Sequence, residues 1–283
     1  MFQDVGPHIL DAQYVLKEIE PTDYVIILRR GELLTITEDE LYRTPTYSEL
    51  NADYEIELEQ PVHLITVEGR GFFFADIDLN EQGHFKFQKL DVLRQIRPRG
   101  LAFAAATGAH LGNWYRQNRF CGHCGHQMEL GNGERKLVCP ACGLQVFPKI
   151  SPAIIVGGKN DNQLLLTKYS AGYNHYALIA GFVEIGETLE DAIRREVYEE
   201  TGLEVENIHY YKSQPWAFSQ SVLVGFFADL APKDTYPTSE YKNDDGELAL
   251  AKWFTRDKIP HDERREDSLT WTMIEAFRNG ENA

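Results

Sequence analysis

The chain has 283 residues, of which 43% are hydrophobic and 25% charged, so it is expected to be globular, with one large domain or two smaller ones. Its formal net charge of −16 argues against broad electrostatic binding to nucleic acid or to an anionic membrane surface. No apolar run approaches about 18 residues, and the N-terminus lacks a basic segment followed by an apolar core, so we expect no membrane span, no signal peptide and a cytoplasmic location.

Residues 1–95 are predicted to form a mostly-β domain. Two pairs of apolar segments are each joined by a glycine-containing turn, which is typical of β-hairpins. The pairs are 24–28 with 33–36, and 63–67 with 72–79. The domain carries no chemical motif, so we interpret it as a packing or dimerisation domain.

Residues 96–120 have a helical, alanine-rich pattern and are predicted to form a connecting helix. Arg94 precedes this segment, and Arg97 lies at its start. Either arginine could reach an anion, although solvated helix charges are the simpler interpretation of both.

All four cysteines lie within residues 121–147, as two Cys-x-x-Cys pairs that are each followed by glycine. The residues are Cys121, Cys124, Cys139 and Cys142. Four thiolates with this spacing predict a closed tetrahedral zinc site with a structural role. Two disulfides, or iron in the same sulfur cage, are the alternatives, and His123 and His126 are interpreted as loop residues.

Residues 148–283 alternate between short apolar runs and amphipathic segments, which predicts a mixed α/β sheet. The expected strands are 153–156, 163–168, 175–180, 208–212, 222–229 and 249–254. Residues 213–221 are expected to connect two strands, 231–247 to form a polar, acidic loop, and 268–279 to form a closing helix.

The middle of the segment 181–203 is predicted to form an amphipathic helix. Thr188 is a suitable N-cap with Asp191 three residues later, and Gly202 can supply a left-handed C-cap. At about 100° per residue, the apolar side chains form one arc of the helix. These side chains are Leu189, Ala192, Ile193 and Val197.

Acidic residues occupy the same arc. Glu196 and Glu200 fall inside it, and Glu199 lies at its border. Carboxylates are rarely buried unless they are paired, and like charges four residues apart repel each other. A cluster of oxygen donors favours bound Mg²⁺ or Mn²⁺. The alternative is a solvated acidic face with a neighbouring arginine.

Nine residues of this segment match every fixed position of the Nudix box, G-x5-E-x7-R-E-U-x-E-E-x-G-U, in which U is aliphatic. They are Gly181, Glu187, Arg195, Glu196, Val197, Glu199, Glu200, Gly202 and Leu203. The chain therefore resembles the Nudix hydrolases, which cleave a nucleoside diphosphate linked to another group. The resemblance implies an α/β/α sandwich with a mixed sheet.

The resemblance also implies roles for individual residues. Glu196, Glu199 and Glu200 would bind divalent cations, and Glu200 would activate water, with Glu199 as its competitor for that role. Arg195 would orient the glutamates, Glu187 would be an accessory acid, and the backbone oxygen of Ala180 would face a metal.

The segment 213–221, SQPWAFSQS, resembles the SQPWPFPxS array of the NADH pyrophosphatase branch of the family, which also carries a four-cysteine ribbon before its Nudix domain. Ala217 and Ser219 replace two prolines of that array. The resemblance implies a further set of dinucleotide-binding residues and one further metal ligand. They are Phe147, Phe182, Ser213, Gln214, Trp216, Phe218 and Ser221 for the dinucleotide, and Glu247 for the metal.

The expected activity is therefore hydrolysis of the pyrophosphate of NADH or NAD⁺ to AMP and the nicotinamide mononucleotide, with Mg²⁺ or Mn²⁺. One alternative is hydrolysis of NAD-capped RNA ends. Another is a nucleic-acid-binding ribbon protein with a ligand-sensing Nudix domain, since four cations lie near the ribbon. They are Arg116, Arg119, Arg135 and Lys136. A homodimer is implied by the resemblance alone.

Overall fold

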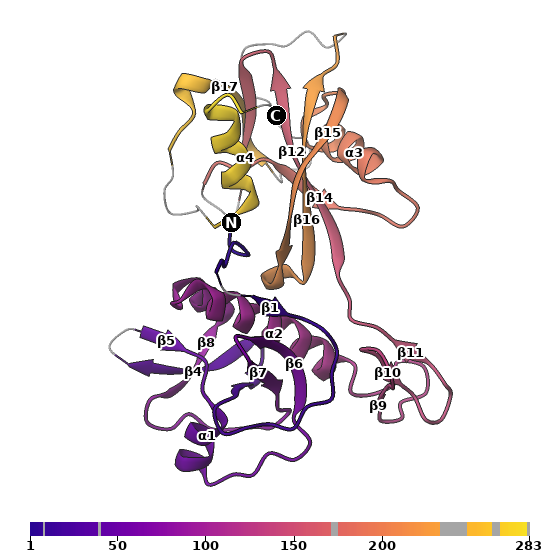
Figure 1. The fold of residues 1–283 in the computed structure, drawn as a ribbon. Helices are drawn as coiled ribbons and strands as arrows, with labels where there is room; N and C mark the ends of the chain where they lie inside the picture. The colour runs from indigo at the N-terminus through magenta and orange to yellow at the C-terminus, as the bar shows by residue number, and fades with distance from the viewer. Residues whose placement is uncertain (8, 39–40, 171–174, 233–247, 262–266, 282–283) are drawn as a thin grey trace. The chain divides into compact units, whose positions relative to one another are not determined.

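The computed structural model describes residues 1–7, 9–38, 41–170, 175–232, 248–261 and 267–281. Two compact units make up the chain (Figure 1). One contains residues 2–149 together with 217–220, and the other contains 150–216 and 221–283 with Met1. The helix 96–120 and the ribbon 121–147 thus lie in the same unit as the N-terminal segment. In the described part of the chain, no helix is long and apolar enough to cross a membrane.

The C-terminal unit is built on one six-stranded sheet in the order β15-β16-β12-β13-β17, with β14 paired to β12. The strands are β12 (Ser151–Asn160), β13 (Gln163–Tyr169), β14 (Ile179–Phe182), β15 (Val205–Trp216), β16 (Ser221–Leu230) and β17 (Leu248–Thr255). The strand β12 is parallel to β16 but antiparallel to β13 and β14, so the sheet is mixed, as predicted.

One helix covers each face of this sheet. The helix α3 (Leu189–Thr201) packs on the face that includes Ile154 and Val156, whereas α4 (Leu269–Arg278) packs on the face that includes Ile155. Successive side chains of a strand point to opposite faces, which is why this fully apolar run supplies both cores. The arrangement is the predicted α/β/α sandwich, and a short 3₁₀ helix, η3 (Arg256–Lys258), follows β17.

Two differences from the predicted strand bounds lie next to the predicted site residues. The strand β15 continues through residues 213–216, because these residues pair with β16 as far as the Trp216–Ser221 pair. Only η2 (Ala217–Ser219) and Gln220, whose φ is +54°, make the connection. The strand β14 begins at Ile179, since pairing with β12 starts there. Most of the predicted loop 231–247 lies outside the described residues.

The N-terminal segment is mostly β, as predicted, and forms two four-stranded sheets. The first has the order β1-β6-β7-β2, and the second has the order β3-β4-β5 with β8 paired to β4. Their strands are β1 (Leu10–Asp11), β2 (Tyr24–Ile26), β3 (Leu28–Arg29), β4 (Glu32–Glu38), β5 (Leu41–Arg43), β6 (Val62–Val67), β7 (Arg70–Phe74) and β8 (Phe85–Lys89). Both predicted hairpins form, β3–β4 and β6–β7, and the second strand of the latter ends at Phe74.

Three helices complete this part of the chain: α1 (Tyr47–Tyr54), η1 (Leu90–Gln95) and α2 (Arg99–Gln117). The helix α2 lies very close to both sheets, because a Cβ built on Gly112 would come within 2.9 Å of Phe74 in β7 and 3.1 Å of Leu28 in β3. The small residues of its alanine-rich sequence thus permit close helix–sheet packing.

Candidate active site and zinc ribbon

The helix α3 has the caps that its sequence predicts. The Thr188 side chain accepts a hydrogen bond from the Asp191 amide at 3.1 Å, and Gly202 ends the helix with φ +71°. Glu200 is only 5% exposed, and the Glu196 side chain is 15% exposed, whereas that of Glu199 is 53% exposed. The prediction that two carboxylates turn toward the protein interior is confirmed.

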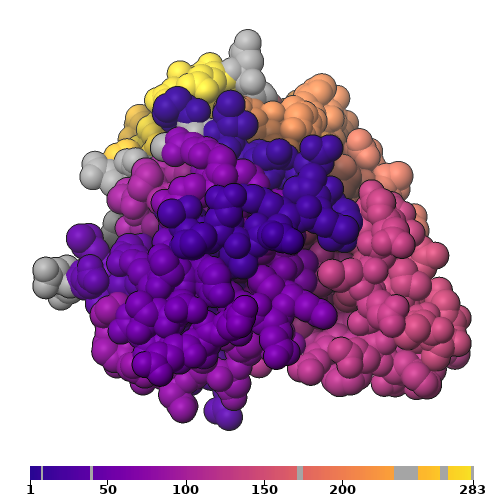
Figure 2. Space-filling view, turned by 60° about the horizontal axis from the view of Figure 1, so that its bottom comes forward, coloured from indigo at the N-terminus to yellow at the C-terminus, as the bar shows by residue number. Residues whose placement is uncertain are grey.

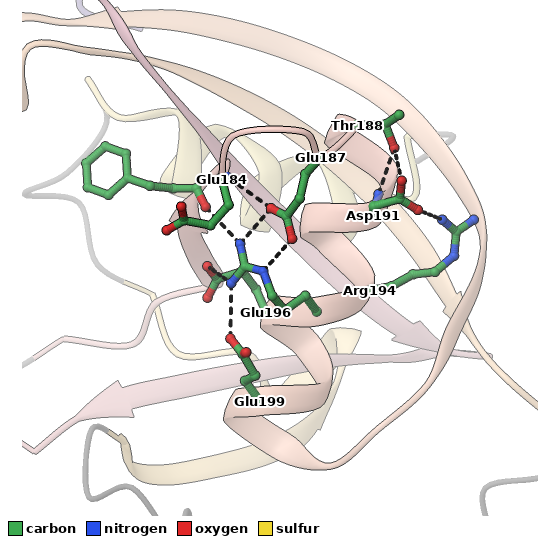
Figure 3. Close-up of polar contacts among 9 residues, drawn as sticks. Glu184, Glu187, Thr188, Asp191, Arg194, Glu196 and Glu199 are labelled. Atoms are coloured by element: carbon green, nitrogen blue, oxygen red, sulfur yellow. Dashed lines mark hydrogen bonds and ion pairs between the residues drawn. The ribbon is translucent and has the colours of Figure 1, made fainter.

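A guanidinium group lies at the centre of the acids (Figure 3). Arg195 forms a bidentate pair with Glu187, with Nε–Oε1 2.6 Å and Nη2–Oε2 2.9 Å. Its Nη1 donates to Glu196 at 2.7 Å and to Glu199 at 3.0 Å. Its Nη2 also donates to the Phe182 carbonyl at 3.0 Å. One planar cation therefore holds the box loop and two turns of α3 in a single arrangement.

These hydrogen bonds shift the pKa values of both Glu187 and Arg195. The hydrogen bonds from Arg195 lower the pKa of Glu187 from 4.5 to about 2, and the Glu184 amide adds a further hydrogen bond at 2.9 Å. The hydrogen bonds to Glu187 and Glu196 raise the pKa of Arg195 above its ordinary value. The pair is therefore charged throughout the physiological pH range.

Gly181 makes room for one of the acids. In the ladder between β14 and β12, Gly181 is opposite Ile154, which belongs to the core under α3. Cross-strand partners share a face, so Gly181 faces α3 as well. A Cβ built on Gly181 would collide with the carboxylate of Glu196. The first glycine of the box is thus required because the carboxylate occupies the place of a side chain.

The donor set suits a hard divalent cation. One guanidinium faces Glu187, Glu196 and Glu199, and Glu200 is buried on the same helix, so carboxylates outnumber the cation. Carboxylate and carbonyl oxygens are the preferred ligands of Mg²⁺ and Mn²⁺. Glu196 also lies against the residue that follows Ala180, whose carbonyl is the predicted backbone ligand. Glu247, the remaining predicted ligand, lies outside the described residues.

The segment 213–221 is a strand and a short turn. Gln214 is fully buried, its Nε2 donates to the Asp267 carbonyl at 2.9 Å, and its Oε1 accepts from the Leu269 amide at 2.8 Å. Its amide therefore binds the backbone on both sides of the N-cap of α4. Ser221 is buried, and exposed Ser213 accepts a hydrogen bond from Tyr210 at 3.4 Å.

The aromatic residues that were predicted to contact a substrate differ in exposure. Phe147 and Phe182 are 50% and 53% exposed, so their rings are available to a ligand. Trp216 is half-buried. The half-buried ring of Phe218 lies 5.9 Å from the ring of Phe2.

The four cysteines converge, as predicted. Their Sγ atoms lie within 4.8 Å of one another, and Cys121–Cys142 and Cys124–Cys139 are 3.6 and 3.4 Å apart. Zn–S bonds of about 2.3 Å in a tetrahedron place sulfurs about 3.8 Å apart, so the cluster fits zinc. All four are free thiols, which excludes the disulfide interpretation for this structure.

Each cysteine pair forms the same tight turn. Gly125 donates its amide to the Cys121 carbonyl at 2.9 Å, and Gly143 donates to Cys139 at 3.0 Å. Both glycines have a positive φ, +77° and +76°, which explains the glycine after each pair. The backbone amide of Cys142 lowers the pKa of Cys139 to about 6, which favours the thiolate that zinc binds.

The ribbon contains β9 (Glu129–Leu130), β10 (Leu137–Val138) and β11 (Gln145–Val146), and it lies against the N-terminal strands (Figure 2). Arg135, in the spacer between the cysteine pairs, donates to the Leu64 carbonyl at 2.6 Å. Tyr14 donates to the Gly131 carbonyl at 3.2 Å. These contacts fix the ribbon to β6 and its neighbours.

The sequence did not predict two parts of the box loop. One is the Phe182 carbonyl, which accepts from Arg195, and the other is Gly186, whose φ of +96° turns the loop toward the helix. A glycine two residues before the N-cap, such as Gly186, is a sequence signal for this turn. A carbonyl acceptor such as that of Phe182 cannot be predicted from the residue type, because every residue has a backbone carbonyl.

Comparison with known protein families agrees with both sites. A family described as "NUDIX domain" matches residues 149–273, and one described as "NADH pyrophosphatase zinc ribbon domain" matches residues 116–147. A crystal structure of a NUDIX hydrolase from Nitrosomonas europaea is similar, with 24% identity, a TM-score of 0.45, and coverage of 58% of this chain and 95% of that one.

Curated relatives share more of the sequence. The NAD-capped RNA hydrolase NudC of Klebsiella pneumoniae (strain 342) is 40% identical over 171 residues, which are 59% of this chain and 64% of that protein. The protein of the same name from Edwardsiella ictaluri is 40% identical over 176 residues, which are 61% of this chain and 66% of that protein. The match thus spans slightly less than two thirds of either relative. The chain carries a NUDIX domain that follows a zinc ribbon of the NADH pyrophosphatase type.

Proposed function

We propose that this protein hydrolyses the pyrophosphate bond of NADH or NAD⁺ to AMP and the corresponding nicotinamide mononucleotide. The observation that supports this most is the arrangement of α3, where Glu196 and Glu200 turn inward and Arg195 holds the neighbouring acids. The zinc ribbon of the NADH pyrophosphatase type is a second, independent support.

Mg²⁺ or Mn²⁺, held by the Ala180 carbonyl, Glu196, Glu199, Glu200 and Glu247, would neutralise the phosphates and acidify a bound water. Glu200 accepts the proton of the attacking water, with Glu199 as the alternative base. The water oxygen bonds to phosphorus, and the bridging oxygen leaves with the other nucleotide. Arg195 is a positioning residue, since its donors are directed at the carboxylates and the Phe182 carbonyl.

Two exposed aromatic rings are the proposed base contacts, Phe147 and Phe182. Base–aromatic stacking contributes about 1–3 kcal/mol per base. Ser213, Trp216, Phe218 and Ser221 are proposed to shape the dinucleotide site, with Gln214 acting through α4. Ala217 and Ser219, where the array has prolines, make the connection less rigid, which favours a broad preference between NADH and NAD⁺.

The direct test is AMP release from NADH by the purified, zinc-loaded protein with Mg²⁺ or Mn²⁺. We expect metal-dependent release of AMP and reduced nicotinamide mononucleotide in equal amounts. If neither metal supports release from NADH or NAD⁺, the proposed activity is wrong.

Hydrolysis of NAD-capped RNA is the second candidate, because the similar proteins from Klebsiella pneumoniae and Edwardsiella ictaluri carry that name. The same pyrophosphate is cleaved in both substrates. Competition between NADH and a short NAD-capped transcript, at equal concentrations, gives the ratio of the two kcat/KM values and so decides which substrate is preferred.

The nucleic-acid-binding alternative has less support. Arg119 pairs with Asp76 at 3.3 Å and Lys136 with Glu134 at 3.1 Å. Arg116 donates to the Leu28 carbonyl, and Arg135 donates to that of Leu64. The four cations that suggested this alternative therefore form ion pairs or hydrogen bonds with other residues of this chain.

We further propose a homodimer in the cytoplasm. The homodimer follows from the family resemblance, and the cytoplasmic location agrees with four cysteines that are free thiols. Light scattering of the purified protein tests the first, and cell fractionation tests the second.

A further inference from the structure

A pocket of about 220 Å³ lies in the N-terminal domain, and its lining contains no residue of the box and none of the ribbon cysteines. Three arginines line it, Arg43, Arg70 and Arg97, and its described lining contains no acidic residue. They come from β5, β7 and the segment before α2, so the fold gathers cations from three distant parts of the sequence. In a protein with net charge −16, such a cluster is unexpected.

Two of these cations have no carboxylate partner among the described residues. Arg70 donates to the Thr22 carbonyl and to the Tyr24 hydroxyl at 2.6 Å. Arg97 donates to the carbonyls of Arg94 and Ile96, at 3.0 and 2.9 Å.

Arg43 differs from the other two. Its guanidinium is paired with Glu49 at 2.8 Å and lies 3.9 Å from Glu38. Among the described residues, two positive charges in the pocket lining therefore lack a carboxylate within ion-pair distance, those of Arg70 and Arg97. They match the charge of a phosphate monoester, which is about −1.5 to −2 at neutral pH.

The rest of the pocket is apolar and aromatic. Tyr24 and Phe72 stack with ring centroids 4.7 Å apart, and Ile96 and Leu101 contribute aliphatic surface. Leu101 belongs to the first turn of α2, whose N-cap, Pro98, has no side chain to accept from the helix amides. The first turn therefore adds positive potential to the lining of the pocket.

We propose that this pocket binds a phosphate monoester carried on a compact ring, with Arg70 and Arg97 holding the phosphate. Guanidinium groups bind phosphate oxygens through paired, charge-assisted hydrogen bonds. The apolar walls accept the ring. The volume is below the roughly 300–1,000 Å³ of pockets for drug-sized ligands, so the ligand is small. This binding does not depend on the catalytic activity proposed above.

Phenyl phosphate is the probe, titrated calorimetrically into the full-length, zinc-loaded protein without Mg²⁺ or Mn²⁺. We expect saturable binding that is weakened about tenfold or more by R97Q, which is the loss of one charge-assisted hydrogen bond. Leu101→Trp, which fills the cavity and leaves its charge unchanged, should abolish binding. The matched control is Arg30→Gln, an exposed arginine in the β3–β4 turn of the same domain, which should leave binding unchanged.

Several results would overturn the proposal: no saturable binding of phenyl phosphate, equal binding by the wild type, R97Q and L101W, or equal weakening by R97Q and R30Q. Benzoate has the ring but a single negative charge, so binding of benzoate as tight as that of phenyl phosphate would refute the phosphate assignment.

Comparison of AMP with a 5′-phosphorylated RNA dinucleotide identifies the source of the ligand. Tighter binding of AMP indicates a free metabolite, and tighter binding of the dinucleotide indicates an RNA end. Circular dichroism and melting temperature confirm that each variant is folded.

Discussion

The carboxylate of Glu196 lies against the Cα of Gly181, in the space that a side chain at position 181 would fill. This contact connects the strand β14 directly to the helix α3. Because the carboxylate is 15% exposed and also bonded to Arg195, its position is set from two sides. The relationship makes the glycine a sensitive test of the proposed metal site.

We therefore expect Gly181→Ala to displace the Glu196 carboxylate and to lower kcat for NADH by about a hundredfold, since an ångström of misplacement can cost that much. AMP release under saturating metal measures it. Gly158→Ala is the matched control, because its new Cβ would approach only Leu165, at 3.8 Å. Near-normal turnover by G181A, with the protein folded, would show that Glu196 does not need this position.

Glu200→Gln removes the proposed base while keeping the size of the side chain. Loss of general-base catalysis costs about 10²–10⁴ in rate, so kcat should fall by that factor with the melting temperature little changed. Glu190→Gln, on the exposed side of the same helix, is the control. If E200Q kept most of its activity while the equivalent Glu199 variant lost it, the role of base would pass to Glu199.

The ion pair between Glu187 and Arg195 predicts a pH dependence of stability. Arg195 lowers the pKa of Glu187 from 4.5 to about 2, so the pair stabilises the folded state above pH 4.5. That contribution is lost as the pH falls from 4.5 toward 2. Glu187→Gln should thus be less stable than the wild type at pH 7, and the two denaturation midpoints should approach each other below pH 4.5. A difference that stays constant down to pH 2.5 would contradict the pairing.

Cys139→Ser should reduce the zinc content from about one ion per chain toward zero and lower the melting temperature, because three thiolates leave an incomplete tetrahedral site. Atomic absorption gives the stoichiometry. His126→Ala is the control, since its backbone carbonyl, and not its imidazole, is used in the turn. Zinc loss in H126A, or full zinc content in C139S, would disprove the four-cysteine site.

Gln214→Ala removes the amide that bonds the Asp267 carbonyl and the Leu269 amide. Leaving buried backbone groups unsatisfied costs about 1–3 kcal/mol, and we expect the free energy of unfolding to fall by that amount in urea. Gln163→Ala, a half-buried glutamine in β13, controls for the truncation. If Q214A instead left stability unchanged and raised KM for NADH, Gln214 would be a substrate contact.

The predictions from sequence that succeeded depend on local regularities. The two cysteine pairs and their glycines specify two identical turns, and four thiolates brought together in this way suit one zinc ion. The caps of α3 follow from the residue types at Thr188 and Gly202, and the inward position of Glu200 follows from helix periodicity. Such features can be derived because neighbouring residues in the sequence are also neighbours in space.

Contacts between segments that are distant in the sequence could be determined only from the tertiary structure. The residues 213–216 form a strand because β16 pairs with them, and Gln214 binds the start of α4 because that helix begins beside it. The arginine pocket joins side chains from β5, β7 and the start of α2, whose separation in the sequence hides their proximity. Residue type predicts what a side chain can bind, but packing between distant elements decides which partner it meets.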